Sequence, residues 1–248
     1  MARWFVACDH AAMCGRFTQQ LSTSEFARIF GAEALDDDPG GHFNLAPMRM
    51  ASVVVEGDER RAIVAYRWGL VPSWAKDQRV GSRMINARSE TIATSPAFRG
   101  AFAKRRCLVP ADAFYEWHRV GKGPSQPYAI RHEDGTPLAF AGIWSLWREP
   151  GAAEDAEPLR TFSIVTTTAN EVLAPIHDRM PVIVAPGAWP LWLGAEPAGP
   201  GELQALLRPA PAEGLVRYPV ARYVGDVRND GPILVEPIVL PEDPAATT

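Results

Sequence analysis

Prolines and glycines interrupt this chain at short intervals along its whole length. The 248 residues include 23 prolines and 20 glycines, which are scattered rather than gathered into linkers. Neither residue is favoured inside a helix or a central strand. The chain is therefore expected to fold from many short segments, and it contains no internal repeat and no linker between domains.

Apolar segments between these interruptions have the composition of β-strands. They are rich in Val, Ile, Phe, Tyr and Trp, and they are bounded by Gly, Pro or Asp. The segment HEDGTP, residues 132–137, has Asp134 and Gly135 at its centre and predicts a hairpin turn. The predicted strands cover residues 51–56, 62–70, 105–110, 126–131, 138–146, 159–167, 181–186 and 215–220.

Helical segments are fewer. Residues 22–31 begin with a Ser/Thr cap and end at Gly31, which is typical of a short capped helix. Similar patterns occur at residues 95–105, 186–194 and 201–207.

The order of these elements constrains the fold class. Strands and helices do not alternate as βαβ units, which disfavours a parallel doubly wound sheet. We predict a single α+β domain over residues 14–240. Its sheet should be curved, barrel-like and mainly antiparallel, with short helices around it. Residues 241–248 are expected to form a flexible tail.

Charge and cysteine content limit the environment of the protein. The net charge is −4, which weighs mildly against a nucleic-acid partner, although a local arginine cleft can coexist with an acidic remainder. Cys8, Cys14 and Cys107 show neither paired nor metal-type spacing, so we expect a reducing compartment and no metal or other cofactor. No apolar run reaches the roughly 18 residues of a membrane helix. We therefore expect a cytoplasmic protein that has no membrane partner.

The first residues do not resemble a secretory signal. The apolar segment from Trp4 to Cys8 is too short and is followed by Asp9. A second methionine, Met13, stands directly before Cys14. Cysteine is usually either buried and inert or placed for reactivity, and composition alone leaves both interpretations of Cys14 open.

Six motifs combine polar or charged residues with aromatic or apolar ones instead of alternating as plain strands do. In order and spacing they resemble the SRAP family, named for SOS-response-associated peptidase, from Cys14 to about Ile238. The resemblance implies an SRAP-like fold and a bacterial, nucleoid-associated monomer that shields abasic sites in single-stranded DNA. The motifs are MCGRF (13–17), NLAPM (44–48), RWGLVPSW (67–74), INARSET (85–91), ADAFYEW (111–117) and IHDRMPVI (176–183).

The resemblance also suggests a use for Cys14. In the family the reactive cysteine is the mature N-terminus, so residues 1–13 are expected to be a leader or a misassigned start. A free N-terminal cysteine has an α-amine pKa near 7.7–8.0 and a thiol pKa near 8.5. Its amine can add to the aldehyde of an opened abasic sugar, and its thiol can close a thiazolidine in an intramolecular step. An internal cysteine lacks the amine and cannot do this.

Three further residues complete the predicted catalytic group. Glu116 is flanked by large apolar side chains in FYEW, which predicts desolvation, a raised pKa and a role in moving protons. By resemblance it contacts the amine and assists autoproteolytic exposure of Cys14, a hydrolase- or lyase-like activity. His177 can exchange the proton that opens the sugar ring. Asn86, by resemblance, orients the thiazolidine.

Arginines and apolar residues are the predicted DNA contacts. Arg16, Arg88 and Arg179 each stand two residues after a predicted catalytic residue, and residues i and i+2 share a face of an extended backbone. This spacing predicts an electropositive lining for phosphates. Unstacked bases would contact apolar side chains, although a core role is equally open for Trp74 and Met84. The predicted base contacts are Pro47, Trp68, Trp74 and Met84.

Two other functions are compatible with these residues. A thiol peptidase acting on other proteins could use Cys14 with His177 and Glu116. It would gain nothing from a cysteine placed directly after a methionine. A non-covalent module for single-stranded DNA could use the arginines alone, with the cysteine incidental.

Overall fold

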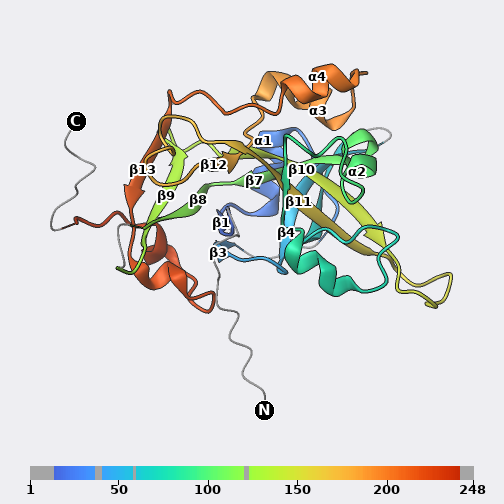
Figure 1. The fold of residues 1–248 in the computed structure, drawn as a ribbon, viewed down its shortest axis with the longest axis horizontal. Coiled ribbons are helices and arrows are strands. Elements are labelled where there is room, and N and C mark those ends of the chain that lie inside the picture. Colours follow the sequence, from blue (N-terminus) through green and yellow to red (C-terminus); the bar gives the residue numbers. More distant parts are fainter. Residues whose placement is uncertain (1–13, 37–40, 58–59, 120–122, 241–248) are drawn as a thin grey trace, which may run out of the picture.

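The structure is a computed structural model that describes residues 14–36, 41–57, 60–119 and 123–240. The predicted leader and the predicted tail, residues 1–13 and 241–248, lie outside the described residues. Figure 1 shows the strands in two groups, with β13, β9 and β8 on one side of the molecule and the strands around β4, β10 and β11 on the other. No helix in the described ranges is long and apolar enough to cross a membrane.

Five strands form a closed barrel. They are connected in the order β5, β4, β7, β10 and β11 by antiparallel pairing, and a parallel pairing of β11 with β5 closes the ring. At the closure, Thr161 lies opposite Arg67 and Phe162 lies opposite Trp68. The curved, mainly antiparallel sheet predicted from the sequence is confirmed. The barrel strands are β4 (Met50–Glu56), β5 (Arg61–Trp68), β7 (Arg106–Ala111), β10 (Leu138–Trp147) and β11 (Leu159–Thr168).

Short strands extend both sides of this barrel. Strands β12 and β6 pair with β11, and β2 pairs with β5. A second, antiparallel sheet has the order β13, β9, β8, β1 and β3. The chain passes from the barrel to this sheet at Asp112, between β7 and β8. The bounds are β1 (Phe17–Gln19), β2 (Glu33–Ala34), β3 (His42–Leu45), β6 (Asn86–Arg88), β8 (Ala113–His118), β9 (Gln126–His132), β12 (Arg179–Pro181) and β13 (Leu215–Pro219).

Helices are short, as predicted, and the first is capped at both ends. In α1 the Ser22 hydroxyl accepts the Glu25 backbone N–H, and the Glu25 carboxylate accepts the Ser22 N–H at 2.8 Å. Gly31 ends the helix with φ 61°. The remaining helices match the predicted segments in place but are shorter. The helices and 3₁₀ turns are α1 (Thr23–Phe30), η1 (Gln78–Arg83), α2 (Arg99–Lys104), η2 (Pro186–Ala188), α3 (Trp189–Leu193), α4 (Pro200–Ala205), η3 (Arg222–Gly225) and η4 (Pro232–Val235).

Two local predictions were wrong. Residues 132–137 form a turn, but β9 and β10 on either side belong to different sheets and do not pair as a hairpin. Gly135 at φ 78° supplies the bend, and a turn of this kind does not by itself specify which strands will pair. Residues 181–186 were predicted as a strand, whereas β12 ends at Pro181 and only Ile183 makes a further bridge, to Phe140.

A close approach of two glycines fixes the loop after β5. A Cβ atom at Gly69, where φ is +123°, would lie 2.7 Å from the Gly81 carbonyl oxygen. We expect Gly69→Ala to lower the free energy of unfolding by about 2–4 kcal/mol, through backbone strain and overpacking. Urea unfolding checks this, with Gly187→Ala as the control because nothing lies within 4 Å of a Cβ there. A Gly69→Ala chain as stable as the Gly187→Ala chain would contradict the expectation.

Candidate active site

Cys14 and Glu116 meet between β1 and β8. Phe17 pairs with Phe114, and this register carries Glu116 on β8 to the residues that precede β1. The backbone nitrogen of Cys14 donates to Glu116 Oε1 at 2.8 Å, and the Cys14 thiol lies close enough to the same carboxyl group for Glu116 to raise its pKa. Both residues are 3% exposed. Cys14 has a φ of 47°, which is strained for a residue with a side chain.

The buried position changes the acidity of both groups. Burial raises the pKa of Glu116 above 4.5, against the lowering effects of His177 and of the hydrogen bonds from Cys14. Burial, together with the nearby Glu116 carboxyl group, also raises the pKa of the Cys14 thiol well above 9.0. The predicted desolvation and raised pKa of Glu116 are therefore confirmed. At neutral pH the thiol keeps its proton.

His177 lies close enough to Glu116 for its charge to affect the carboxyl group. It follows a turn in which its backbone nitrogen donates to Leu173 O at 2.9 Å. The ring Nδ1 is 3.0 Å from the backbone nitrogen of Arg179 and 3.2 Å from the carboxylate of Asp178, which is largely exposed. Because the backbone N–H has a fixed direction, Nδ1 accepts from it. In the neutral ring the proton is then on Nε2.

Strand β11 brings the INAR and HDRM motifs together. Asn86 on β6 lies opposite Ile164, and Arg88 lies opposite Thr166. On the other edge of β11, Arg179 donates to Thr166 O at 2.7 Å and to Thr166 Oγ1. The two motifs therefore flank the same short stretch of one strand.

The predicted phosphate-binding arginines differ in their surroundings. Arg88 is exposed. Arg179 is 6% exposed and forms a two-point ion pair with Glu90, with one N–O distance of 3.0 Å. Its Nε has no hydrogen-bond partner among the described residues, and its charge offsets a small part of the rise in the pKa of the Cys14 thiol. Only Arg88 of these two thus presents an exposed guanidinium in this structure.

Arg16 anchors a distant segment of the chain. Its guanidinium donates to Asn44 Oδ1 at 2.8 Å and to Val224 O at 2.7 Å, and it lies over the ring of Trp117. Asn44 is buried, and its amide donates to three backbone carbonyls between residues 224 and 229. This residue was missed as a site component, although it opens the NLAPM motif. Arg16 and Asn44 together fasten the chain after β13 beside β1.

The apolar candidates are divided between surface and core. Trp74 is 64% exposed, and Pro47 and Met84 are half-buried. The prediction that Trp68 contacts bases was wrong. Its ring is 0% exposed, lies 5.0 Å from Phe17 in the barrel core and donates its indole N–H to Ile85 O.

Comparison with known proteins identifies the family. The model of the family described as SOS response associated peptidase (SRAP) matches residues 13–227, which contain every site motif. The chain belongs to the SRAP family. The SRAP match begins at residue 13, one residue before Cys14. The backbone nitrogen of Cys14 is the one that donates to Glu116.

Relatives at similar identity come from different bacteria. The abasic site processing protein YoqW of Bacillus subtilis is 36% identical over 226 residues, covering 90% of this chain and 99% of that protein. The abasic site processing protein YedK of Escherichia coli is 33% identical, covering 91% of this chain and 100% of YedK. A crystal structure of a protein from Bacteroides thetaiotaomicron has a TM-score of 0.79 at 24% identity, over 91% of this chain and 100% of that one. It shows that the fold of this SRAP chain is shared.

One feature of this SRAP site determines its chemistry. A single buried carboxyl group contacts both the nitrogen and the sulfur of one cysteine. Any proton that leaves one of these atoms can reach the other through Glu116 without entering bulk water.

Proposed function

We propose that this protein captures abasic sites in single-stranded DNA covalently, through a thiazolidine formed by a mature N-terminal Cys14. The observation that carries the proposal is the contact of Glu116 with both the nitrogen and the thiol of Cys14. The names of the relatives YoqW and YedK, both abasic site processing proteins, support it. Acting as a monomer, the protein would shield the lesion from strand cleavage.

The reaction joins Cys14 to C1′ of the opened sugar in three steps. The amine lone pair forms an N–C bond with the aldehyde carbon, and the carbonyl oxygen takes up a proton. The resulting hydroxyl takes up the proton that the nitrogen gives up and leaves as water, which gives an imine. The sulfur then bonds to the same carbon while the thiol proton passes to the nitrogen. The product is a five-membered ring, and the adduct weighs one water less than its two components.

Glu116 supplies the proton transfers. Because burial raises its pKa, its carboxyl group keeps a proton more readily than an exposed glutamate does. A protonated carboxyl group beside the amine leaves the amine neutral and nucleophilic and can protonate the aldehyde oxygen. Once deprotonated, it can accept the thiol proton during ring closure and return it to the nitrogen.

His177, Asn86 and the arginines complete the proposed mechanism. The sugar opens to the aldehyde when its ring oxygen takes up a proton from water and its C1′ hydroxyl gives one up to water, and the Nε2–H of His177 can donate a hydrogen bond to the ring oxygen during this step. Asn86 would orient the sugar from the edge of β11. Arg88 supplies an exposed charge for a phosphate, and the Nε of Arg179 supplies a further donor near Cys14.

Exposure of the amine is a second proposed activity. In the described chain the Cys14 nitrogen belongs to a peptide bond, and Glu116 lies 2.8 Å from it. When water cleaves this bond, the carboxyl group is placed to protonate the departing nitrogen. An active form would therefore begin at Cys14, and residues 1–13 would be absent from it.

A general thiol peptidase is less compatible with this site. Such enzymes depend on a cysteine whose pKa is lowered, because the thiolate is the nucleophile. The pKa of Cys14 is raised instead. No hydrogen bond joins its thiol to His177 in the described part of the chain.

Covalent capture can be tested with a chain that begins at Cys14 and a single-stranded oligonucleotide carrying one abasic site. We expect a shifted band on a denaturing gel, with the mass of protein plus DNA minus one water. The Cys14→Ser chain is the control and should give no stable adduct. If the chain beginning at Cys14, confirmed by mass, gives no adduct either, the proposed function is wrong.

A further inference from the structure

Two arginine side chains are buried within the described ranges, and their charges are compensated in different ways. Arg106, 9% exposed, donates to three backbone carbonyls in α2 and α3. Arg179, 6% exposed, forms an ion pair with the carboxylate of Glu90. A buried charge is costly unless a partner compensates it, so the placement of Arg179 depends on Glu90.

The contacts of Arg179 leave one of its donors unpaired. Both carboxylate oxygens of Glu90 accept from the guanidinium, and the Nη2–Oε2 distance is 3.0 Å. Nη2 also donates to the backbone oxygen of Thr166 at 2.7 Å and to its hydroxyl oxygen at 3.2 Å. The Nε is buried and has no hydrogen-bond partner among the described residues. Because a guanidinium is planar, its two-point contact with a carboxylate fixes the direction of the Nε–H.

Glu90 is itself held in place by a braced turn, which follows β6 within the motif INARSET. The backbone nitrogen of Ser89 donates to Thr166 O at 2.9 Å, and the side chain of Gln204 on α4 donates to Ser89 O at 2.9 Å. Strand β11 and α4 therefore fix the residue that precedes Glu90. The hydrogen bond from Arg179 holds the pKa of Glu90 below 4.5, so its carboxylate is ionised at neutral pH.

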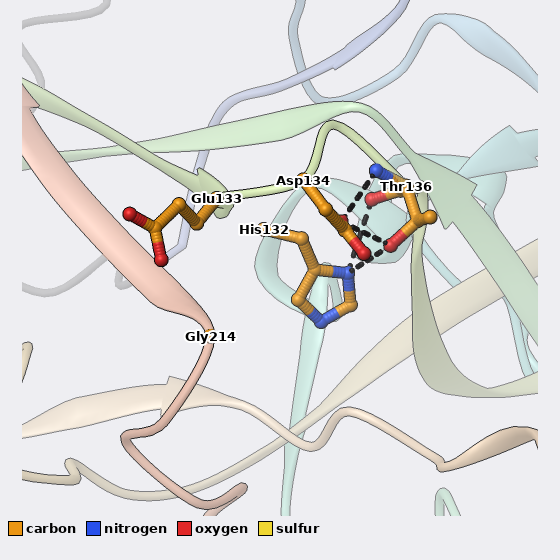
Figure 2. A pocket seen from close by; sticks show the side chains of 5 residues that line it. All are labelled: His132, Glu133, Asp134, Thr136 and Gly214. Carbon is orange, nitrogen blue, oxygen red and sulfur yellow. Dashed lines mark hydrogen bonds between the residues drawn. The ribbon is translucent and has the colours of Figure 1, made fainter.

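A polar cluster at the turn between β9 and β10 is self-contained by comparison. Figure 2 shows it, with His132, Glu133, Asp134 and Thr136 around a recess. Asp134 Oδ1 accepts from the Thr136 nitrogen at 2.9 Å and from its hydroxyl at 2.7 Å, and His132 Nδ1 lies 3.1 Å from the same hydroxyl oxygen. In the part of the chain that the structure describes, no side chain of this cluster is a buried group without a partner. The cluster gives no sign of a bound group, in contrast to the unpaired Nε–H of Arg179.

This unpaired donor lies beside the catalytic group. The charge of Arg179 acts on the Cys14 thiol, and the Arg179 backbone nitrogen donates to His177 Nδ1 at 3.0 Å. Because the Arg179 side chain is only 7% exposed, a ligand oxygen reaches the Nε by entering the site next to these residues. In the proposed capture reaction, the groups that enter are the opened sugar and the phosphates attached to it. Of their oxygens, those of a phosphate are the stronger acceptors for a guanidinium.

We propose that Glu90 is a positioning residue for capture: its carboxylate holds Arg179 so that the Nε–H donates to a phosphate oxygen next to the sugar bound at Cys14. Glu90 acts through Arg179 and does not contact the DNA. The proposal rests on the proposed function for the identity of the bound oxygen. A donor that is already oriented helps to align the sugar carbon with the nucleophile, so Glu90 contributes to the rate of capture more than to the affinity for the strand.

Single-turnover capture separates these two quantities. Chains that begin at Cys14 are mixed, in increasing excess, with a labelled single-stranded oligonucleotide carrying one abasic site, and denaturing gels over time give the rate. The data yield the maximal rate and the protein concentration at half-maximal rate. For Glu90→Gln we expect the maximal rate to fall about tenfold, because glutamine has no charge and only one acceptor oxygen. The half-saturating concentration should change less than about threefold.

The matched control is Glu56→Gln. Glu56 forms an ion pair of 3.2 Å with Arg61 where β4 and β5 pair, and both side chains are partly buried. This variant should capture at the rate of the parent chain. A double-mutant cycle then tests whether Glu90 acts through Arg179. Once Arg179→Gln has slowed capture, adding Glu90→Gln should slow it no further.

The outcomes separate the role of Glu90 from the proposed function. Urea unfolding establishes that each compared chain is folded, and if Glu90→Gln does not fold, Glu90→Asp, which is one methylene shorter, takes its place in the cycle. A maximal rate equal to that of the parent, a loss confined to affinity, or losses that multiply in the double variant would overturn the role of Glu90 while the parent still forms its adduct. A parent chain that forms no adduct overturns the proposed function and this role with it.

Discussion

A chain that keeps one residue in front of Cys14 is expected to bind abasic single-stranded DNA and to form no covalent adduct with it. The extra residue turns the α-amine into an amide, whose nitrogen lone pair is delocalised and does not add to aldehydes. The thiol can give only a reversible hemithioacetal, and the amine of the added residue can give only a reversible imine, because that residue has no thiol to close a thiazolidine. The ring-closing step also loses the advantage of being intramolecular, which is worth many orders of magnitude in effective concentration.

The measurement compares two chains that differ by one residue. One begins at Cys14 and the other carries a single glycine before it, and both are mixed with the same abasic oligonucleotide. The intact mass of the second chain is measured before and after the reaction, so that only chains that still carry the glycine are compared. We expect the rate of adduct formation on a denaturing gel to fall at least about 10³-fold in the extended chain. Fluorescence anisotropy, measured before the samples are denatured, should show that both chains bind the abasic oligonucleotide with similar affinity. Equal adduct formation would mean that the α-amine is not the nucleophile.

Local chemistry made much of this molecule predictable. The Ser22 cap and Gly31 terminate α1 through contacts within a few residues, so the sequence pattern suffices to locate the helix. The burial of Glu116 follows from its apolar neighbours in FYEW, and the structure confirms it. Features of this kind depend on residues that are adjacent in the chain.

Long-range pairing was not predictable in the same way. The barrel closes through Phe162 on β11 and Trp68 on β5, residues far apart in the sequence. That pairing places Trp68 in the core while Trp74, six residues later, remains exposed. Both tryptophans stand in one motif, and no local pattern distinguishes them. The role of Asn44 depends likewise on a segment about 180 residues away.

Glu116→Gln is expected to slow covalent capture by at least about 10²-fold without unfolding the protein. The amide can still accept the hydrogen bond from the Cys14 nitrogen. It has no acidic proton for the aldehyde oxygen and cannot take the thiol proton during ring closure. In the chain beginning at Cys14, denaturing gels over time give the rate. If the Glu116→Gln chain captures abasic DNA as fast as the parent chain at every pH between 6 and 8, Glu116 does not transfer protons in the reaction.

Stability measured as a function of pH distinguishes a role of Glu116 in proton transfer from a purely structural role. In the full-length chain the pKa of Glu116 is raised above 4.5 on folding. Between the pKa of the unfolded state and the higher pKa of the folded state, the folded state therefore binds more protons. The contribution of Glu116 to the free energy of unfolding therefore falls as pH rises through this window. Glutamine does not titrate, so urea unfolding should show the Glu116→Gln chain gaining stability relative to the parent from pH 4.5 upward. A variant that captures poorly and is also less stable at pH 8 than at pH 5, relative to the parent, would instead indicate that Glu116 is a structural anion.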